Sequence, residues 1–154
     1  MTIYLVRHAS AGHRNGADPH DGERHLDTKG LAQAAAVATH LGARPIEAVL
    51  SSPYPRCVET VERLATELGL EVAIDKRLAE GTDIERSWKV LEKWAARTVV
   101  LCSHGDVIPD LIRRNQVRGM HIPGSSGWSK GSVWALDGWD GNHFATGTFD
   151  KLRD

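Results

Sequence analysis

Apolar residues occur along the chain in short runs that are rich in β-branched side chains, and these runs alternate with longer amphipathic segments. Runs of this length and composition are typical of buried β-strands. The segment 98–103 (TVVLCS) is the clearest of them, and residues 3–6 (IYLV) form another near the N-terminus. The complete set of predicted strands is 3–6, 48–52, 71–75, 98–103, 132–136 and 144–149.

Between these strands, apolar residues recur three or four positions apart, which predicts amphipathic helices. Asp27 or Thr28 can cap the first helix and Gly42 ends it, whereas Pro53 and Pro55 open the second. The predicted buried faces are Leu31, Ala34, Ala35, Ala38 and Leu41; Val58, Val61, Ala65 and Leu68; Ile84, Trp88, Leu91 and Ala95; and Val107, Ile108, Leu111 and Ile112. The polar, glycine-containing stretches 10–25 and 115–130 are predicted to be loops.

Strands that alternate with helices predict an α/β fold, here a three-layer α/β/α sandwich with a mainly parallel central sheet. We expect residues 1–154 to form a single domain, since this length can bury a core of ordinary size. In such sheets, ligands bind beyond the carboxyl ends of the strands. That rule draws attention to Arg7-His8 after the first strand, Arg56 after the second and His104 after the fourth.

Composition narrows the class of protein. The hydrophobic content of 41% is that of a globular domain, and the net charge of −1 gives no reason to expect nucleic acid or an anionic membrane as a partner. No apolar run approaches the ~20 residues of a membrane span, and the N-terminal MTIYLVRHAS has no basic leader, so we expect a cytoplasmic location. Cys57 and Cys102 are expected to be buried, reduced thiols, with a disulfide as the weaker alternative.

The dipeptide Arg7-His8 closes an apolar strand at a position where a core would favour another aliphatic residue. A buried arginine costs stability unless it has an anion to hold. A second Arg-His pair, Arg24-His25, lies in a polar loop with no strand before it, and is interpreted as a surface or rim pair. Arg7-His8 is therefore the pair that indicates a site.

His104 has the same context, because it follows a strand directly. Gly105 lets a ligand approach the backbone, and a helix that begins there offers free N–H groups to a phosphate. Arg56, in the first turn of its helix, carries a guanidinium that matches phosphate oxygens in a two-pronged fashion. These residues together indicate a phosphate-binding site.

Five motifs occur in order along the chain: Arg7-His8-Ala9, Leu26…Gly30…Gln33-Ala34, Ser51-Ser52-Pro53…Arg56…Glu59-Thr60, Leu78…Glu80 and Ser103-His104-Gly105. Their order and spacing resemble those of the histidine phosphatase superfamily, in its phosphoglycerate mutase-like branch 1. They cover roughly residues 2–136, and the short chain is closest in size and pattern to the SixA-type phosphohistidine phosphatases.

The resemblance implies that His8 is the nucleophile and that Arg7, Arg56 and His104 bind the phosphoryl oxygens. Glu80 would be the proton donor, with Asp83 and Glu85 as alternative acids. Asp106 is less favoured as the acid, because Gly105 separates it from His104. Two arginines and a second histidine supply positive charge, so we expect neither a metal nor another cofactor.

The expected partner is a phosphorylated small molecule or a phosphohistidine protein. Ala9 and Ser10 depart from the pattern of the true mutases, and no large insertion between Glu80 and His104 could cover a small sugar phosphate. Both features favour a SixA-type protein substrate, but a glutamate at position 80 is often missing from that type. Sugar and nucleotide phosphates therefore stay open, as does a phosphate-binding module without turnover.

Other side chains receive weaker assignments. Arg14, Asn15 and Arg24 are candidates for the pocket rim. Ser125, Ser126, Lys130 and Ser132 are candidates for substrate contact from the loop before the fifth strand. His13, His20 and His25 lack the zinc-like spacing that would predict a metal site. Trp128, Trp134 and Trp139 are predicted to pack or to form a shallow rim.

Overall fold

The computed structural model describes residues 1–152 and shows an α/β fold in three layers. Its strands are β1 (Thr2–Arg7), β2 (Ala48–Ser51), β3 (Val72–Ile74), β4 (Val99–Ser103), β5 (Val133–Trp139) and β6 (Phe144–Asp150). Its helices are α1 (Thr28–Leu41), α2 (Pro55–Glu67), α3 (Ile84–Trp94) and α4 (Val107–Val117), with 3-10 turns at Asp21–Glu23 and Lys76–Leu78. The predicted fold class is confirmed.

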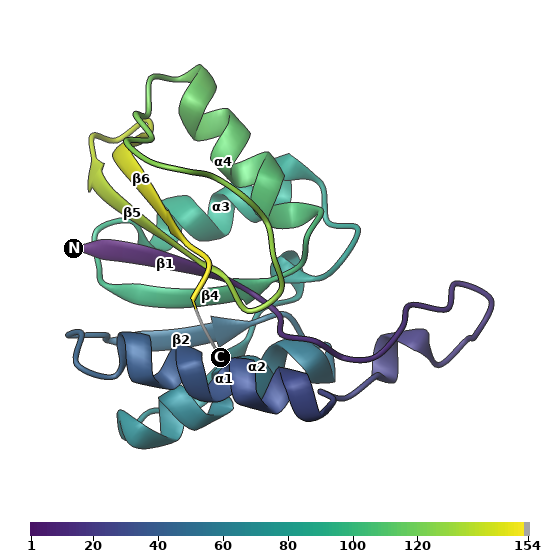
Figure 1. Ribbon diagram of the computed structural model, residues 1–154. Helices are drawn as coiled ribbons and strands as arrows, with labels where there is room; N and C mark the ends of the chain where they lie inside the picture. The colour runs from purple at the N-terminus through teal and green to yellow at the C-terminus, as the bar shows by residue number, and fades with distance from the viewer. Residues whose placement is uncertain (153–154) are drawn as a thin grey trace.

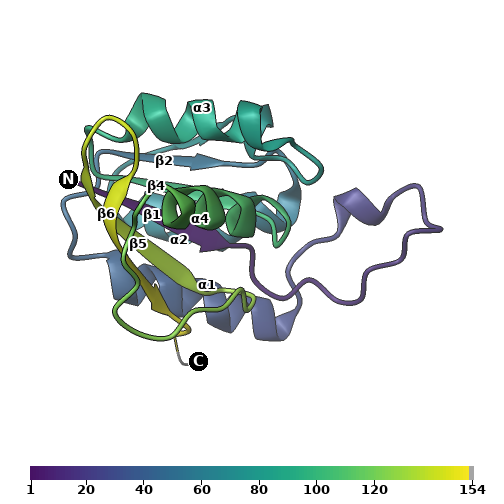
Figure 2. The same cartoon turned by 90° about the horizontal axis from the view of Figure 1, so that it is seen from above.

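One sheet holds all six strands in the order β3-β2-β4-β1-β5-β6. The first four are parallel to their neighbours, and β5 and β6 add an antiparallel edge beside β1. Helices α1 and α2 cover one face of the sheet, and α3 and α4 cover the other (Figures 1 and 2). None of the helices in residues 1–152 is both long and apolar enough to cross a membrane.

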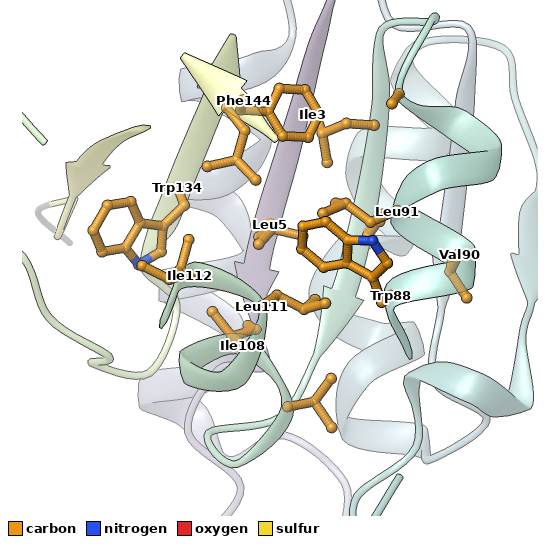
Figure 3. Packing of buried hydrophobic residues seen from close by; sticks show 14 of the residues in the cluster. Ile3, Leu5, Trp88, Val90, Leu91, Ile108, Leu111, Ile112, Trp134 and Phe144 are labelled. Atoms are coloured by element: carbon orange, nitrogen blue, oxygen red, sulfur yellow. The ribbon is translucent and has the colours of Figure 1, made fainter. Parts of the chain in front are cut away.

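The central strands are buried on both faces, which explains their nearly continuous apolar sequences. In β1, Ile3 and Leu5 pack in the cluster that includes α3 and α4, whereas Tyr4 and Val6 pack in the cluster with α1 and α2. Figure 3 shows the first cluster, where the Trp88 ring lies beside Leu5 and Leu91. Burial on both sides fixes the position of β1 in the middle of the sheet.

The pairing of β1 with β4 determines where the candidate residues meet. Arg7 lies opposite Ser103, and the His8 N–H continues the ladder with a 3.0 Å hydrogen bond to the Ser103 carbonyl. His8 and His104 are therefore the next residues on two adjacent parallel strands. The topology brings them together although 96 positions separate them in the sequence.

Three details differ from the sequence-based predictions. Helix α4 continues to Val117, whereas residues 115–130 were predicted to be a loop; Asn115 is buried and bonds to the Leu111 carbonyl and the Phe144 N–H. Leu31 is 61% exposed rather than on the buried face of α1. In α2 the buried face includes Arg56 and Thr60, because this helix turns polar side chains towards the site as well as apolar ones towards the sheet.

The loop after β1 is held against the start of α1. The Asp27 carboxylate caps α1 at the Gly30 N–H and also accepts hydrogen bonds from the Ser10 hydroxyl and the Gly12 N–H. These bonds hold the pKa of Asp27 down to about 2. A Cβ on Gly30 would lie 1.9 Å from the Ser10 carbonyl oxygen, so only glycine allows this close approach.

We therefore expect Gly30→Ala to be destabilising, by about 1–3 kcal/mol, because the added methyl must push the Ser10 backbone away from α1. Urea unfolding measures the change. Gly16→Ala is the matched control, since a Cβ at Gly16 meets nothing within 4 Å. Equal stability of the two variants would contradict the close packing of α1 on this loop.

Candidate active site

His8 is buried, with one ring nitrogen engaged and the other free. Its Nδ1 lies 2.9 Å from the Ala9 carbonyl oxygen, which can only accept, so Nδ1 carries the hydrogen. Nε2 then keeps its lone pair. Burial lowers the pKa of His8 to about 4, against the opposing effect of the Ala9 bond, and Arg56 and Arg7 lower it further. The ring is thus a neutral imidazole at pH 7, the form that can act as a nucleophile.

His104 lies next to His8, with 5.3 Å between the ring centroids. Its Nε2 is 2.8 Å from the Ser52 hydroxyl oxygen, and that oxygen also accepts the Tyr54 N–H at 3.3 Å. The Ser52 hydroxyl can donate its hydrogen to Nε2, and in that arrangement the hydrogen of neutral His104 lies on Nδ1. Burial, together with His8 and Arg56, lowers the pKa of His104 to about 2. The Nδ1 atom is buried and has no partner among the described residues.

Two arginines complete the cluster. The Arg56 side chain is 1% exposed, and its Nε and Nη1 lack hydrogen-bond partners within residues 1–152, as does the buried Nε of Arg7. Arg7 donates from Nη1 to the Trp128 carbonyl at 2.6 Å, and Arg56 stacks over Tyr54 at 4.8 Å. Burial, followed by the charge of Arg56, lowers the pKa of Arg7. Unsatisfied buried donors are costly, and an oxyanion between them would satisfy all of these groups.

Gly105 makes room for Arg7. A Cβ at this position would lie 2.9 Å from the Arg7 guanidinium carbon. The space that the sequence analysis assigned to an approaching ligand is thus occupied by a side chain. The first N–H of α4, from Val107, is bound by the Asp106 carboxylate at 2.9 Å.

Glu80 lies at the edge of the cluster, with its side chain 30% exposed. Its Oε1 is 3.6 Å from Arg56 Nη2, and its Oε2 is 3.9 Å from Arg14 Nη2. Asp106 holds this loop by accepting the Gly81 N–H at 2.8 Å. The Glu80 carboxylate therefore lies within ion-pair distance of both the Arg56 and the Arg14 guanidinium groups.

The alternative acids have other partners. Asp83 caps α3 by accepting the Arg86 N–H, and Glu85 pairs with Arg114. Within residues 1–152, neither carboxylate forms a hydrogen bond or ion pair with the cluster around His8. Among the three candidate proton donors Glu80, Asp83 and Glu85, it is Glu80 that forms an ion pair with Arg56 within the described residues.

The three predicted rim residues have different environments. Arg14 is 71% exposed and faces Glu80. Asn15 stabilises its own loop, through its N–H to Asp21 and its side-chain oxygen to the Ala17 N–H. Arg24 also braces that loop, by bonding the Ala11 carbonyl and pairing with Asp21 at 3.1 Å. Only Arg14 contacts a residue of the cluster.

Several residues of the quoted motifs support the site without reaching it. Thr60 accepts the Ala9 N–H at 2.8 Å and donates to the Arg56 carbonyl at 2.6 Å, so it links the two loops. Gln33 accepts the Ser10 N–H, and Glu59 accepts the Leu26 N–H. These residues belong to the motifs of the sequence analysis, but the sequence did not predict their hydrogen bonds.

The histidines of the long loop lie apart from one another. His20 pairs with Glu23, and His25 pairs with Glu59. Within the described part of the chain, no three His, Cys, Asp or Glu side chains come together as a metal-binding group.

Comparison with known proteins assigns the family. A profile of the histidine phosphatase superfamily (branch 1) matches residues 3–83. The chain belongs to this superfamily. It is also 35% identical over 145 residues to an 8-oxo-(d)GTP phosphatase of Mycolicibacterium smegmatis. This alignment covers 91% of the present chain and 45% of the relative. The chain thus spans less than half the length of the curated relatives that it matches.

Solved histidine phosphatases share the fold. The protein histidine phosphatase SixA in complex with tungstate superposes with a TM-score of 0.75 at 21% identity, covering 100% of this chain and 97% of that one. A mycobacterial glucosyl-3-phosphoglycerate phosphatase in complex with VO3 gives a TM-score of 0.70 at 19% identity, covering 99% and 97%. The predicted family and the SixA-like size are confirmed.

The environment of His8 predicts an unusual titration. With the pKa near 4, His8 stays neutral as the pH falls through 6.5 and gains its proton only near pH 4. NMR titration of the histidine ring resonances should show this late transition for His8. A midpoint for His8 at 6 or above in the ligand-free protein would show that burial and the two arginines do not control this ring.

Proposed function

We propose that this chain is a metal-independent phosphatase that hydrolyses its substrate through a phosphohistidine intermediate on His8. The observation that carries the proposal is the position of a neutral His8, with Nε2 free, among buried donors that lack partners. An arrangement that served packing alone would leave these donors unsatisfied at a considerable cost.

In the first step, the His8 Nε2 lone pair attacks phosphorus in line with the leaving oxygen. The N–P bond forms as the P–O bond breaks, and Glu80 donates its proton to the departing oxygen. In the second step, water attacks the phosphohistidine and gives a proton to the Glu80 carboxylate. The P–N bond breaks, phosphate leaves and the imidazole regains its lone pair.

The protein contributes mainly charge and position to these steps. In phosphoryl transfer, negative charge spreads over the three equatorial oxygens of the transferred group. The guanidinium groups of Arg7 and Arg56 and the Nδ1–H of His104 can bind these oxygens, because each has a buried nitrogen without a hydrogen-bond partner in residues 1–152. We therefore assign them the phosphoryl-binding role.

For the substrate, we propose a phosphorylated small molecule. The curated relative is named for action on a nucleotide, 8-oxo-(d)GTP, and it aligns with 91% of this chain. The presence of the Glu80 carboxyl group beside the cluster adds support, since an alkoxide leaving group needs a proton donor more than imidazole does. A phosphohistidine protein is the alternative substrate, and the dependence on Glu80 described below distinguishes the two.

The first test is capture of the intermediate. Brief reaction with ³²P-labelled substrate, followed by an alkaline quench, should leave label on His8 that survives alkali and is lost in acid. His8→Ala should abolish both label and turnover. His13→Ala is the matched control, since His13 is exposed and outside the cluster. Turnover that persists in His8→Ala would refute the mechanism, and phosphate binding without turnover in the wild type would indicate a binding module.

The second test compares leaving groups. General acid catalysis contributes roughly 10²–10⁴-fold, so Glu80→Gln should reduce kcat/KM for alkyl phosphates by that order. It should affect p-nitrophenyl phosphate and phosphohistidine much less, because their leaving groups depart more easily. Glu85→Gln, which alters a carboxylate paired with Arg114, is the control. Equal slowing of every substrate by Glu80→Gln would show that Glu80 is not the acid.

A further inference from the structure

A second cavity lies beside the candidate site. It has a volume of about 420 Å³ and is enclosed by α1, the segment 129–131 and the end of the described chain at 151–152. Its lining includes Lys29, Lys130 and Lys151 and three polar residues, Ser10, Gln33 and Ser129. None of the catalytic roles proposed above uses the three lysines.

The cavity shares a wall with the phosphoryl site. Ser10 lies two residues after His8, so their Cα atoms are at most about 7 Å apart. On the opposite wall, the Gly131 N–H bonds to the carbonyls of Arg7 at 3.2 Å and His8 at 3.3 Å. The residue before it, Lys130, is close enough to lower the pKa of His8. The cavity therefore borders the backbone that carries His8, through Ser10 on one wall and Gly131 on the other.

The charge of the cavity is strongly positive. Its three lysines come from three separate segments, and none of them forms an ion pair with a carboxylate within residues 1–152. Burial, followed by the charges of Arg7 and Arg24, lowers the pKa of Lys130. Asp27 also faces Lys130, but its carboxylate is bound by Ser10, Gly12 and Gly30. An anion in the cavity would relieve this repulsion.

The neutral polar lining adds to the case for an oxygen-rich ligand. The Ser129 hydroxyl oxygen is buried and has no hydrogen-bond partner among the described residues. Ammonium groups and a free hydroxyl are groups that bind a phosphate.

We propose that this cavity binds a second phosphate group, carried by the leaving group of the substrate. The inference rests on the proposed function, since it assumes that the first phosphate is transferred to His8. The substrate class is then a molecule with two or more phosphates, of which one is released as inorganic phosphate and the other stays on the product. Water supplies the oxygen of the released phosphate and the hydrogen gained by the leaving oxygen.

The test uses three substrates that share one nucleoside: adenosine 5′-monophosphate, adenosine 5′-diphosphate and adenosine 3′,5′-bisphosphate. In the wild-type chain, kcat/KM for at least one two-phosphate substrate should exceed that for the monophosphate by about tenfold or more, as charge-assisted hydrogen bonds would give. The double variant Lys29→Gln/Lys151→Gln should reduce this ratio about tenfold, through a higher KM. Lys89→Gln, on the exposed side of α3, is the matched control.

The outcomes separate this inference from the proposed function. A labelled His8 together with an unchanged ratio in the double variant would overturn the cavity assignment and leave the mechanism in place. Loss of the label in the wild type would overturn the mechanism itself. Methylenediphosphonate should inhibit p-nitrophenyl phosphate hydrolysis competitively, and more weakly in the double variant. Non-competitive inhibition would show a separate effector site and would also overturn the assignment.

Discussion

The candidate site depends on the parallel pairing of β1 with β4 in the centre of the sheet. Both strands are buried on both faces, so a shift of either by one residue would turn its side chains to the wrong helical layer. The resulting register sets Arg7 opposite Ser103. His8 and His104 then leave the sheet side by side. The hydrophobic core thus fixes the distance between two catalytic candidates that contribute nothing to it themselves.

The cluster around His8 is stabilised less by its own contacts than by the elements around it. Burying Arg56 and leaving two of its nitrogens without partners costs free energy that the core on both sides of the sheet must offset. The same burial keeps both histidines neutral, with pKa values of about 4 and about 2. One unfavourable feature of the folded protein therefore produces the two properties on which the proposed mechanism depends, a neutral His8 and nearby donors without partners in residues 1–152.

The supporting contacts explain why the motif residues extend far beyond the reacting groups. Thr60 connects Ala9 to Arg56, while Gly30 lets α1 approach the Ser10 backbone and Asp27 fastens the same loop. Each of these contacts limits the movement of the loop that follows His8. Because positioning contributes so much to phosphoryl transfer, such residues can affect the rate without touching the substrate.

The sequence by itself determined the fold class, the approximate course of the strands and the residues at their carboxyl ends, because burial imposes a local period on each element. Predictions from the sequence were wrong where contacts between distant segments determine the extent of an element or the burial of a residue. Helix α4 extends to Val117 because the buried Asn115 binds Phe144 across the fold, and Leu31 is exposed because no element within residues 1–152 covers it.

Only the tertiary structure decided which side chains meet. It brought Glu80 rather than Asp83 or Glu85 to Arg56, filled the space above Gly105 with Arg7, and gathered three lysines from distant segments around one cavity. These contacts follow from the order of strands in the sheet and from the loops that cross its edge. The strand order and the paths of these loops produce no periodic pattern in the sequence, because the residues that they bring into contact are far apart along the chain.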